Sequence, residues 1–100
     1  MRLSNFEIEA VKKCSSDIFG KDINTYLFGS RVDDSKRGGD IDLLINGVDF
    51  MDANELLLKK LDFLSKLKKL IGDRKIDVVI SKKQDDRLIV QTAINKGILL

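Results

Sequence analysis

The spacing of apolar and polar positions divides the chain into alternating helices and strands. Apolar residues recur every three or four positions over about 5–19, 52–71 and 86–96, which predicts three amphipathic helices. Short apolar runs at 22–28, 40–45 and 75–80 predict strands, residues 31–39 suit one helical turn and a loop, and 98–100 suit a short last strand. This order predicts an α/β (α+β) fold in which helices cover a small mixed sheet.

Local signals set the ends of these helices. Ser4 and Glu7 have capping-box spacing before the first helix, and Asp52 and Glu55 have it before the second. Glycine, which tolerates the backbone conformations found after a helix, follows each of the three, at Gly20, Gly72 and Gly97. We therefore expect helices that begin and end close to these positions.

The apolar faces of the elements define the expected core. The third strand is apolar and β-branched without alternation, which predicts burial on both of its faces. In the long second helix, charged residues such as Lys59, Asp62, Lys66 and Lys69 hold the opposite stripe. The apolar positions expected in the core are Phe6, Ala10, Val11, Cys14 and Ile18 in the first helix and Leu57, Leu61, Leu64, Leu67 and Ile71 in the second.

Composition limits the chemistry that this chain can perform. It has 100 residues with a formal charge of +2, no histidine and one cysteine, and we expect a single domain over 1–100. Histidine-dependent catalysis and Cys/His zinc sites are excluded, and Cys14 is most simply a small buried hydrophobe. The near balance of charge disfavours duplex nucleic acid as the main partner. Carboxylates, lysines, arginines and hydroxyls remain, which favours a hard cation such as Mg²⁺ if a metal is bound.

Three acidic residues stand within predicted strands. Asp40 and Asp42 are two positions apart, so their side chains share one face of a strand at a spacing of ~6.5 Å. Asp77 interrupts the most apolar strand, where an unpaired charge would be costly. If these strands are neighbours, three carboxylates meet, and such a cluster normally holds cations because like charges otherwise repel.

A possible anion site precedes this acidic set. Gly29 and Ser30 follow the first strand, where backbone N–H groups and a hydroxyl can bind phosphate. A lone Gly-Ser pair or a lone Asp-x-Asp is usually an ordinary loop or strand edge. The two motifs together, with nine residues between them and a third acid in a later strand, form a more specific pattern.

These motifs resemble the minimal nucleotidyltransferases of the DNA polymerase β superfamily. The resemblance covers residues 26–80 and rests on Leu-Phe-Gly-Ser-Arg at 27–31, Gly-Asp-Ile-Asp-Leu-Leu-Ile at 39–45 and Lys-Ile-Asp-Val-Val at 75–79. Many relatives have Arg-Ala-x-Gly after the Gly-Ser pair and often serine before the first acid, whereas this chain has Arg-Val-Asp-Asp and Gly39, and its loop is about one residue shorter. These departures affect loop geometry and nucleotide choice but remove no metal ligand.

The resemblance implies a polymerase β-like fold and specific roles for five residues. By analogy, Gly29 and Ser30 bind the nucleotide phosphates. Arg31 follows this pair directly, so it either steadies a phosphate or forms a surface salt bridge with Asp33 or Asp34. Two Mg²⁺ ions would be held by Asp40 and Asp42, with Asp77 completing the metal site and helping to deprotonate the acceptor hydroxyl.

The substrate and the partner follow from the same resemblance. Small members resemble the antitoxin of two-gene systems whose partner is a helical HEPN ribonuclease, which implies transfer of AMP from ATP to a hydroxyl of that partner. Two other functions stay open: an interaction protein that neutralises its partner by binding without catalysis, and nucleotidyl transfer to RNA or a small molecule. A homo- or hetero-oligomer is possible under each of these functions.

The sequence also bears on the location of the protein. No stretch approaches the ~20 consecutive apolar residues of a membrane span, and no secretory apolar segment follows Met1. We therefore expect a soluble, cytoplasmic protein. We also expect the acceptor to come from another molecule, because a chain this short has no room for a template-binding domain beside a catalytic core.

Overall fold

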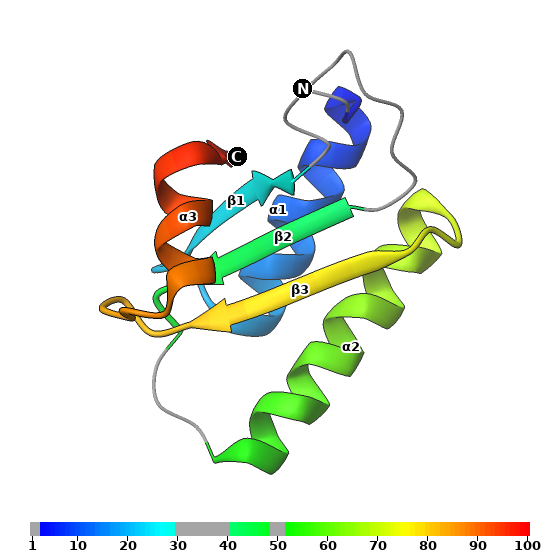
Figure 1. The fold of residues 1–100 in the computed structure, drawn as a ribbon. Coiled ribbons are helices and arrows are strands. Elements are labelled where there is room, and N and C mark those ends of the chain that lie inside the picture. The colour runs from blue at the N-terminus through cyan, green and yellow to red at the C-terminus, as the bar shows by residue number, and fades with distance from the viewer. Residues whose placement is uncertain (1–2, 30–40, 49–51) are drawn as a thin grey trace.

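A computed structural model gives the arrangement of residues 3–29, 41–48 and 52–100, which are the residues described below. Within these ranges, three helices and four strands form an α+β fold with one mixed sheet (Figure 1). The elements are α1 (Asn5–Phe19), β1 (Asn24–Phe28), β2 (Ile41–Asn46), α2 (Ala53–Ile71), β3 (Ile76–Ser81), α3 (Leu88–Lys96) and β4 (Ile98–Leu99). The predicted fold class and the order of these elements are confirmed, whereas the helical turn expected over 31–39 lies outside the described ranges.

The sheet has the strand order β3-β2-β1-β4. β1 runs antiparallel to β2 and to β4, whereas β2 and β3 are parallel. Parallel neighbours need a crossover connection, and α2 lies between β2 and β3 in the chain and supplies it. As a result, the beginnings of β2 and β3 lie at the same end of the sheet as the end of β1 (Figure 1).

Helices lie on both faces of the sheet, and each face contributes its own core. Ile41, Leu43 and Ile45 point to the face covered by α1 and α2, where they pack with Phe63 and Leu67 in the larger core cluster. α3 lies on the other face, over a smaller cluster that includes Leu44, Val90 and Ala93 (Figure 1). Alternate residues of β2 therefore serve different layers, as the period of a strand requires.

Observed contacts account for the helix ends. The Ser4 side chain accepts a hydrogen bond from the Glu7 backbone N–H at 3.1 Å, and the Glu7 side chain accepts one from the Ser4 N–H at 3.0 Å, which confirms the capping box of α1. Asp52 caps α2 by accepting from the Glu55 N–H at 2.9 Å. α3 begins two residues later than its predicted start, with Arg87 at its N-cap and no side-chain cap bond.

Part of the predicted apolar stripe lies at the surface. Phe6 is 64% exposed, and Leu57 and Leu61 are 55% and 53% exposed, so the assignment of these three to the core is wrong. In α2 the buried line runs instead through Phe63 and Leu67. The apolar arc of α2 is wider than the core that it covers, because the N-terminal half of the helix projects beyond the sheet (Figure 1).

The third strand also differs from its prediction. β3 is an edge strand, and its burial alternates at its start, where Ile76 and Val78 are buried and Asp77 between them is exposed. The expectation of burial on both faces is therefore wrong, since α1 and α2 cover one face and α3 reaches only part of the other. A membrane-spanning helix is absent from the described ranges, whose helices are all too short or too polar to cross a bilayer.

Candidate active site

The end of the sheet where β1 finishes and β2 and β3 begin holds two of the predicted acidic residues. Asp42 and Asp77 are register partners in the parallel pair β2 and β3. Paired positions on neighbouring strands direct their side chains to the same face, ~5 Å apart at the Cα atoms. The fold therefore places these two carboxyl groups side by side on the face of the sheet opposite α1 and α2.

Gly29 directly follows β1 at this end and lies against Asp42. Its φ of 76° is in the left-handed region, where L side chains are strained. A Cβ atom at this position would overlap Oδ2 of Asp42 and lie 3.1 Å from its Cγ. Gly29 is thus required twice, once by its backbone conformation and once because the Asp42 carboxylate occupies the space of a side chain.

Three of the predicted site residues lie outside the described ranges: Ser30, Arg31 and Asp40. Their assignment to phosphate and metal binding therefore stays a prediction. Within the ranges that are described, Asp42 and Asp77 are brought together, and no three acidic, cysteine or histidine side chains cluster closely enough to hold a metal. The sequence predicts Asp40 as the third acidic residue of the metal site.

The environment of Asp77 corrects one argument from the sequence. The apolar strand suggested a buried carboxylate that would need a cation, but Asp77 is exposed. Because the Asp77 carboxylate is exposed to water, it loses little hydration and does not need a cation to offset burial. What distinguishes Asp77 is its register opposite Asp42, which is a stronger indication of a shared ligand than burial would be.

One neighbour of the acidic pair was not predicted to belong to the site. Phe28 is the register partner of Asp42 across the antiparallel pair β1 and β2 and is half-buried. The C-terminal end of α3 reaches this point, because a Cβ at Gly97 would lie 2.8 Å from the Leu27 carbonyl oxygen and 3.3 Å from the Phe28 Cβ. The sequence offered one indication that Phe28 belongs to the site, namely its position directly before Gly29. An aromatic residue at the end of a strand is, however, usually interpreted as part of the hydrophobic core.

The carboxylates of Asp42 and Asp77 supply oxygen ligands on one face of the sheet. Adjacent carboxylates on a solvent-accessible face are the ligands that Mg²⁺ prefers, and a glycine turn beside them allows a phosphate to approach the backbone closely. The described part of the site therefore fits a divalent cation with an attached phosphate group.

The family model described as "Polymerase beta, Nucleotidyltransferase" matches residues 13–100. The chain belongs to this family. The nucleotidyltransferase domain so identified contains β1 through β4 and both described carboxylates. A comparison with curated proteins found none that matches the chain.

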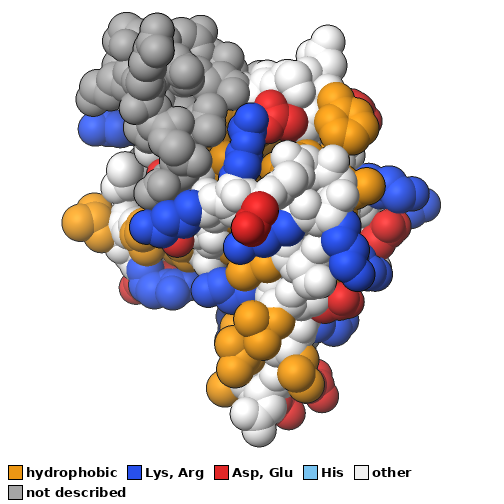
Figure 2. All heavy atoms as spheres, turned by 90° about the vertical axis from the view of Figure 1, so that its right-hand side faces the viewer, with side chains coloured by type: hydrophobic (Ala, Val, Ile, Leu, Met, Phe, Trp, Pro, Cys, Tyr) orange, Lys and Arg blue, Asp and Glu red, His pale blue; other side chains and the backbone are white. Residues whose placement is uncertain are grey.

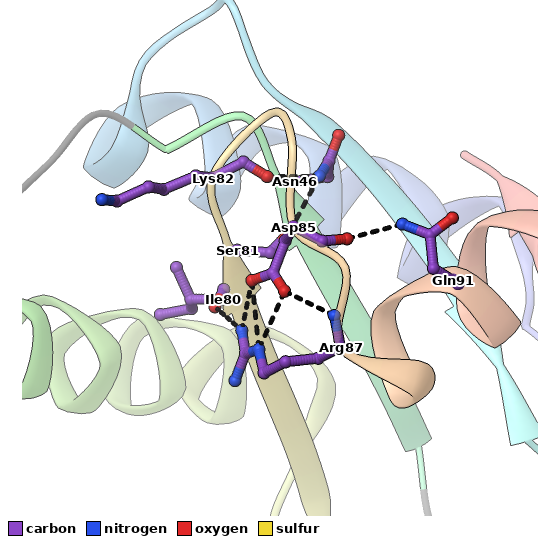
Figure 3. Close-up of polar contacts among 7 residues, drawn as sticks. All are labelled: Asn46, Ile80, Ser81, Lys82, Asp85, Arg87 and Gln91. Atoms are coloured by element: carbon purple, nitrogen blue, oxygen red, sulfur yellow. Dashed lines mark hydrogen bonds and ion pairs between the residues drawn. The ribbon is translucent and has the colours of Figure 1, made fainter.

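The polar cluster at the opposite end of this nucleotidyltransferase is separate from the acidic pair. In the loop that follows β3, Arg87 donates hydrogen bonds to both carboxylate oxygens of Asp85 (Figure 3). It also donates one to the backbone carbonyl of Ile80 in β3. Hydrogen bonds from Arg87 hold the pKa of the Asp85 carboxyl below its usual value. Because β3 begins at Asp77's end and finishes at this loop, the cluster lies outside the candidate active site.

Proposed function

We propose that this nucleotidyltransferase moves a nucleoside monophosphate, AMP from ATP, to a hydroxyl group of a partner protein. The observation that carries the proposal is the register pairing of Asp42 with Asp77 beside the glycine turn at Gly29. The family supplies nucleotidyl transfer as the general reaction. The identities of the nucleotide, the metal and the protein acceptor are what we propose beyond that general reaction.

The residues of the chain suggest how the reaction would proceed. The backbone at Gly29 and the Ser30 hydroxyl would hold the triphosphate, and Asp40 and Asp42 with Asp77 would hold Mg²⁺. When bound, two Mg²⁺ ions would neutralise the charge of the phosphates and lower the pKa of the attacking hydroxyl. Asp77 is exposed and therefore accessible to an acceptor, whose proton its carboxylate would accept.

The bond changes in this step balance without any further reactant. A bond forms between the acceptor oxygen and the α-phosphorus, and the bond from that phosphorus to the bridging oxygen breaks. Pyrophosphate leaves with the electron pair, and the acceptor proton passes to Asp77. Metal-assisted in-line displacement of this kind depends on positioning and charge stabilisation more than on covalent catalysis.

We further propose that the partner is a helical HEPN-type protein and that the pair acts as a toxin and its antitoxin. The support for this assignment is the motif resemblance, and the acceptor therefore has to be identified directly. The gene next to the one encoding this chain is the first to test. A helical product with an Arg-x₄-His motif would support the assignment.

The decisive experiment is mass spectrometry of that gene's product after incubation with this protein, ATP and Mg²⁺. We expect an added mass equal to AMP, and we expect Asp42→Asn or Asp77→Asn to slow its appearance by about 100-fold or more, since several kcal/mol of charge stabilisation is lost. Asp62→Asn is the matched control, because Asp62 is an exposed acid on α2 paired only loosely with Lys66 at 3.9 Å. Its rate should equal that of the wild type.

Other results would replace the proposal. Transfer at the wild-type rate by the double variant Asp42→Asn/Asp77→Asn would contradict the site assignment. Stable association of the two proteins with no added mass under any of the common nucleoside triphosphates would show an interaction protein instead. Labelling of RNA or a small hydroxylated compound, with none of the partner, would keep the reaction and change the acceptor.

A further inference from the structure

The outer edge of β3 presents backbone groups that no strand of the described chain pairs. β3 is the first strand in the sheet order, so only β2 lies beside it. The Lys75 carbonyl accepts from the Ile41 N–H at 3.0 Å and the Ser81 carbonyl accepts from the Gly47 N–H at 3.0 Å, so both face β2. Since direction alternates along a strand, the backbone groups of Ile76, Val78 and Ile80 face outward.

An apolar groove follows this edge. It has a volume of about 410 Å³ and lies between β3 and the first turns of α2. One wall is formed by Val78 and Ile80, and the other by Leu56 and Leu57. The half of α2 that bears Leu57 and Leu61 projects beyond β3, and apolar side chains gather on this projecting tip in Figure 2. A strand added to β3 would therefore lie over exposed apolar side chains of α2.

One end of the edge is closed. Nη2 of Arg87 donates to the outward carbonyl of Ile80 at 3.0 Å, and its contacts with Asp85 at 2.8 to 3.1 Å hold it there (Figure 3). Natural sheets protect exposed edges in this way, with charged groups that block pairing. The closure covers Ile80 and not the outward groups of Ile76 and Val78, of which Val78 lines the groove.

We propose that this edge binds an extended segment of another protein by strand addition. Its backbone would pair with Ile76 and Val78, and its alternate apolar side chains would pack on Leu56 and Leu57, which line the groove. Lys60 and Arg87 are the charged residues among those that line the groove in the described chain, and both are cationic. An acidic residue in the added segment complements them, with Lys60 as its partner because Arg87 already pairs with Asp85.

A second copy of this chain does not fit the same place. Two copies of β3 pairing antiparallel across a twofold axis would keep their α2 helices on the same face of the joined sheet. Each α2 already projects beneath the position of the next strand (Figure 1), so the two helices would compete for one space. A segment without a helix of its own on that face avoids this conflict. The inference is independent of the transfer reaction, because binding can be measured without nucleotide.

The test uses a panel of synthetic peptides of about eight residues, the length of an ordinary strand, in which valine or isoleucine alternates with threonine and one glutamate is moved along the sequence. Each is titrated to about 1 mM, which detects millimolar affinity, into the ¹⁵N-labelled full chain. We expect shifts and slowed hydrogen exchange at the amides of Ile76 and Val78. N-methylation of one alternate set of peptide amides should abolish binding, whereas methylation of the other set should not, because only one set faces β3.

Variants of α2 distinguish binding in the groove from non-specific hydrophobic binding. Leu57→Lys should weaken binding about fivefold or more, since it places a charge in the apolar wall and fivefold corresponds to ~1 kcal/mol. Leu58→Lys is the matched control: Leu58 is 67% exposed on the same helix, yet it does not line the groove. Lys60→Glu should reverse the preference of the panel for glutamate.

Three results would overturn the proposal. One is the absence of binding by every peptide of the panel. Another is binding that is indifferent to which alternate set of amides is methylated, because this would exclude pairing with the edge. The third is a concentration-dependent dimer that Leu57→Lys dissociates and that shifts the same two amides, which would show a second copy of the chain as the occupant.

Discussion

At the scale of single residues, the close approach of Gly29 to Asp42 makes this glycine a sensitive position. Its φ is 76°, and the Asp42 carboxylate fills the space that a side chain would need. Gly72 offers a direct comparison, because its φ is 98° but a Cβ there would meet nothing within 4 Å. The first glycine carries both a conformational and a steric requirement, and the second carries only the conformational one.

We therefore expect Gly72→Ala to cost about 1–2 kcal/mol of unfolding free energy, the price of placing an L side chain in left-handed backbone, and to leave transfer unchanged. Gly29→Ala should cost at least as much and should also reduce nucleotidyl transfer by about tenfold or more, since it displaces the Asp42 carboxylate. Urea denaturation and the transfer assay measure the two effects. Equal activity of the two variants would contradict a role for the Gly29 turn in the site.

The buried thiol predicts a pH dependence. Cys14 is 3% exposed, and burial, with Asp17 nearby, raises the pKa of its thiol above the ordinary value. The folded state therefore favours the protonated thiol, so this contribution to stability is complete below the ordinary thiol pKa of 9.0 and is lost as the pH rises through the higher folded pKa. Urea denaturation between about pH 7 and 10.5 should show a steeper loss for the wild type than for Cys14→Ala. Parallel pH profiles would contradict the prediction.

At the scale of elements, the loop between β3 and α3 depends on one ion pair. Nη2 of Arg87 lies 2.8 Å from Oδ2 of Asp85, and the Asp85 backbone carbonyl accepts from Gln91 in the first turn of α3. α3 has no side-chain cap of its own, so this network is what fastens its N-terminal end. The loop should therefore loosen in acid, where Asp85 becomes protonated.

Because its pKa is lowered in the folded state, Asp85 contributes stability at a pH above its ordinary pKa of 3.8, and this contribution disappears as the pH falls through the lower folded value. Asp85→Asn removes the ion pair at neutral pH. We expect faster amide exchange over residues 85–91 in this variant at pH 7, matching that of the wild type at acidic pH after correction for intrinsic rates. Unchanged exchange would mean that the backbone bonds alone hold the loop.

Sequence patterns predicted where the helices and strands lie better than which of their faces are buried. Caps and glycines placed the ends of α1 and α2 to within a residue, because these signals act over one turn. Periodicity could not tell that Leu57 and Leu61 lie beside the sheet's edge, since it reports that a face is apolar and not what covers it. Likewise, the run around Asp77 did not reveal an edge strand, whereas its proximity to Asp42 followed from the motif order.

At the scale of the whole molecule, stability depends on the layer between the sheet and the pair α1 and α2. Phe63 is fully buried there, and its ring centroid lies 5.9 Å from that of Phe19, a tilted arrangement that links the two helices. The exposed leucines of the same helix contribute much less, because they remain in contact with water.

Phe63→Ala should accordingly cost about 3–5 kcal/mol of unfolding free energy, a large part of the total for a domain of this size. Leu61→Lys should change it by no more than ~0.5 kcal/mol. Urea denaturation monitored by circular dichroism compares the two. A large loss in Leu61→Lys would show that the outer arc of α2 is covered in the native protein.

The parallel pairing of β2 with β3 joins two acidic residues that lie far apart along the chain. Asp42 emerges from the ribosome long before Asp77, and the whole of α2 is made between them. A nascent or truncated polypeptide that ends within α2 therefore has a glycine turn and one carboxylate but not the other. Under the proposed function, products of this gene that end before Asp77 should be inert toward nucleotides.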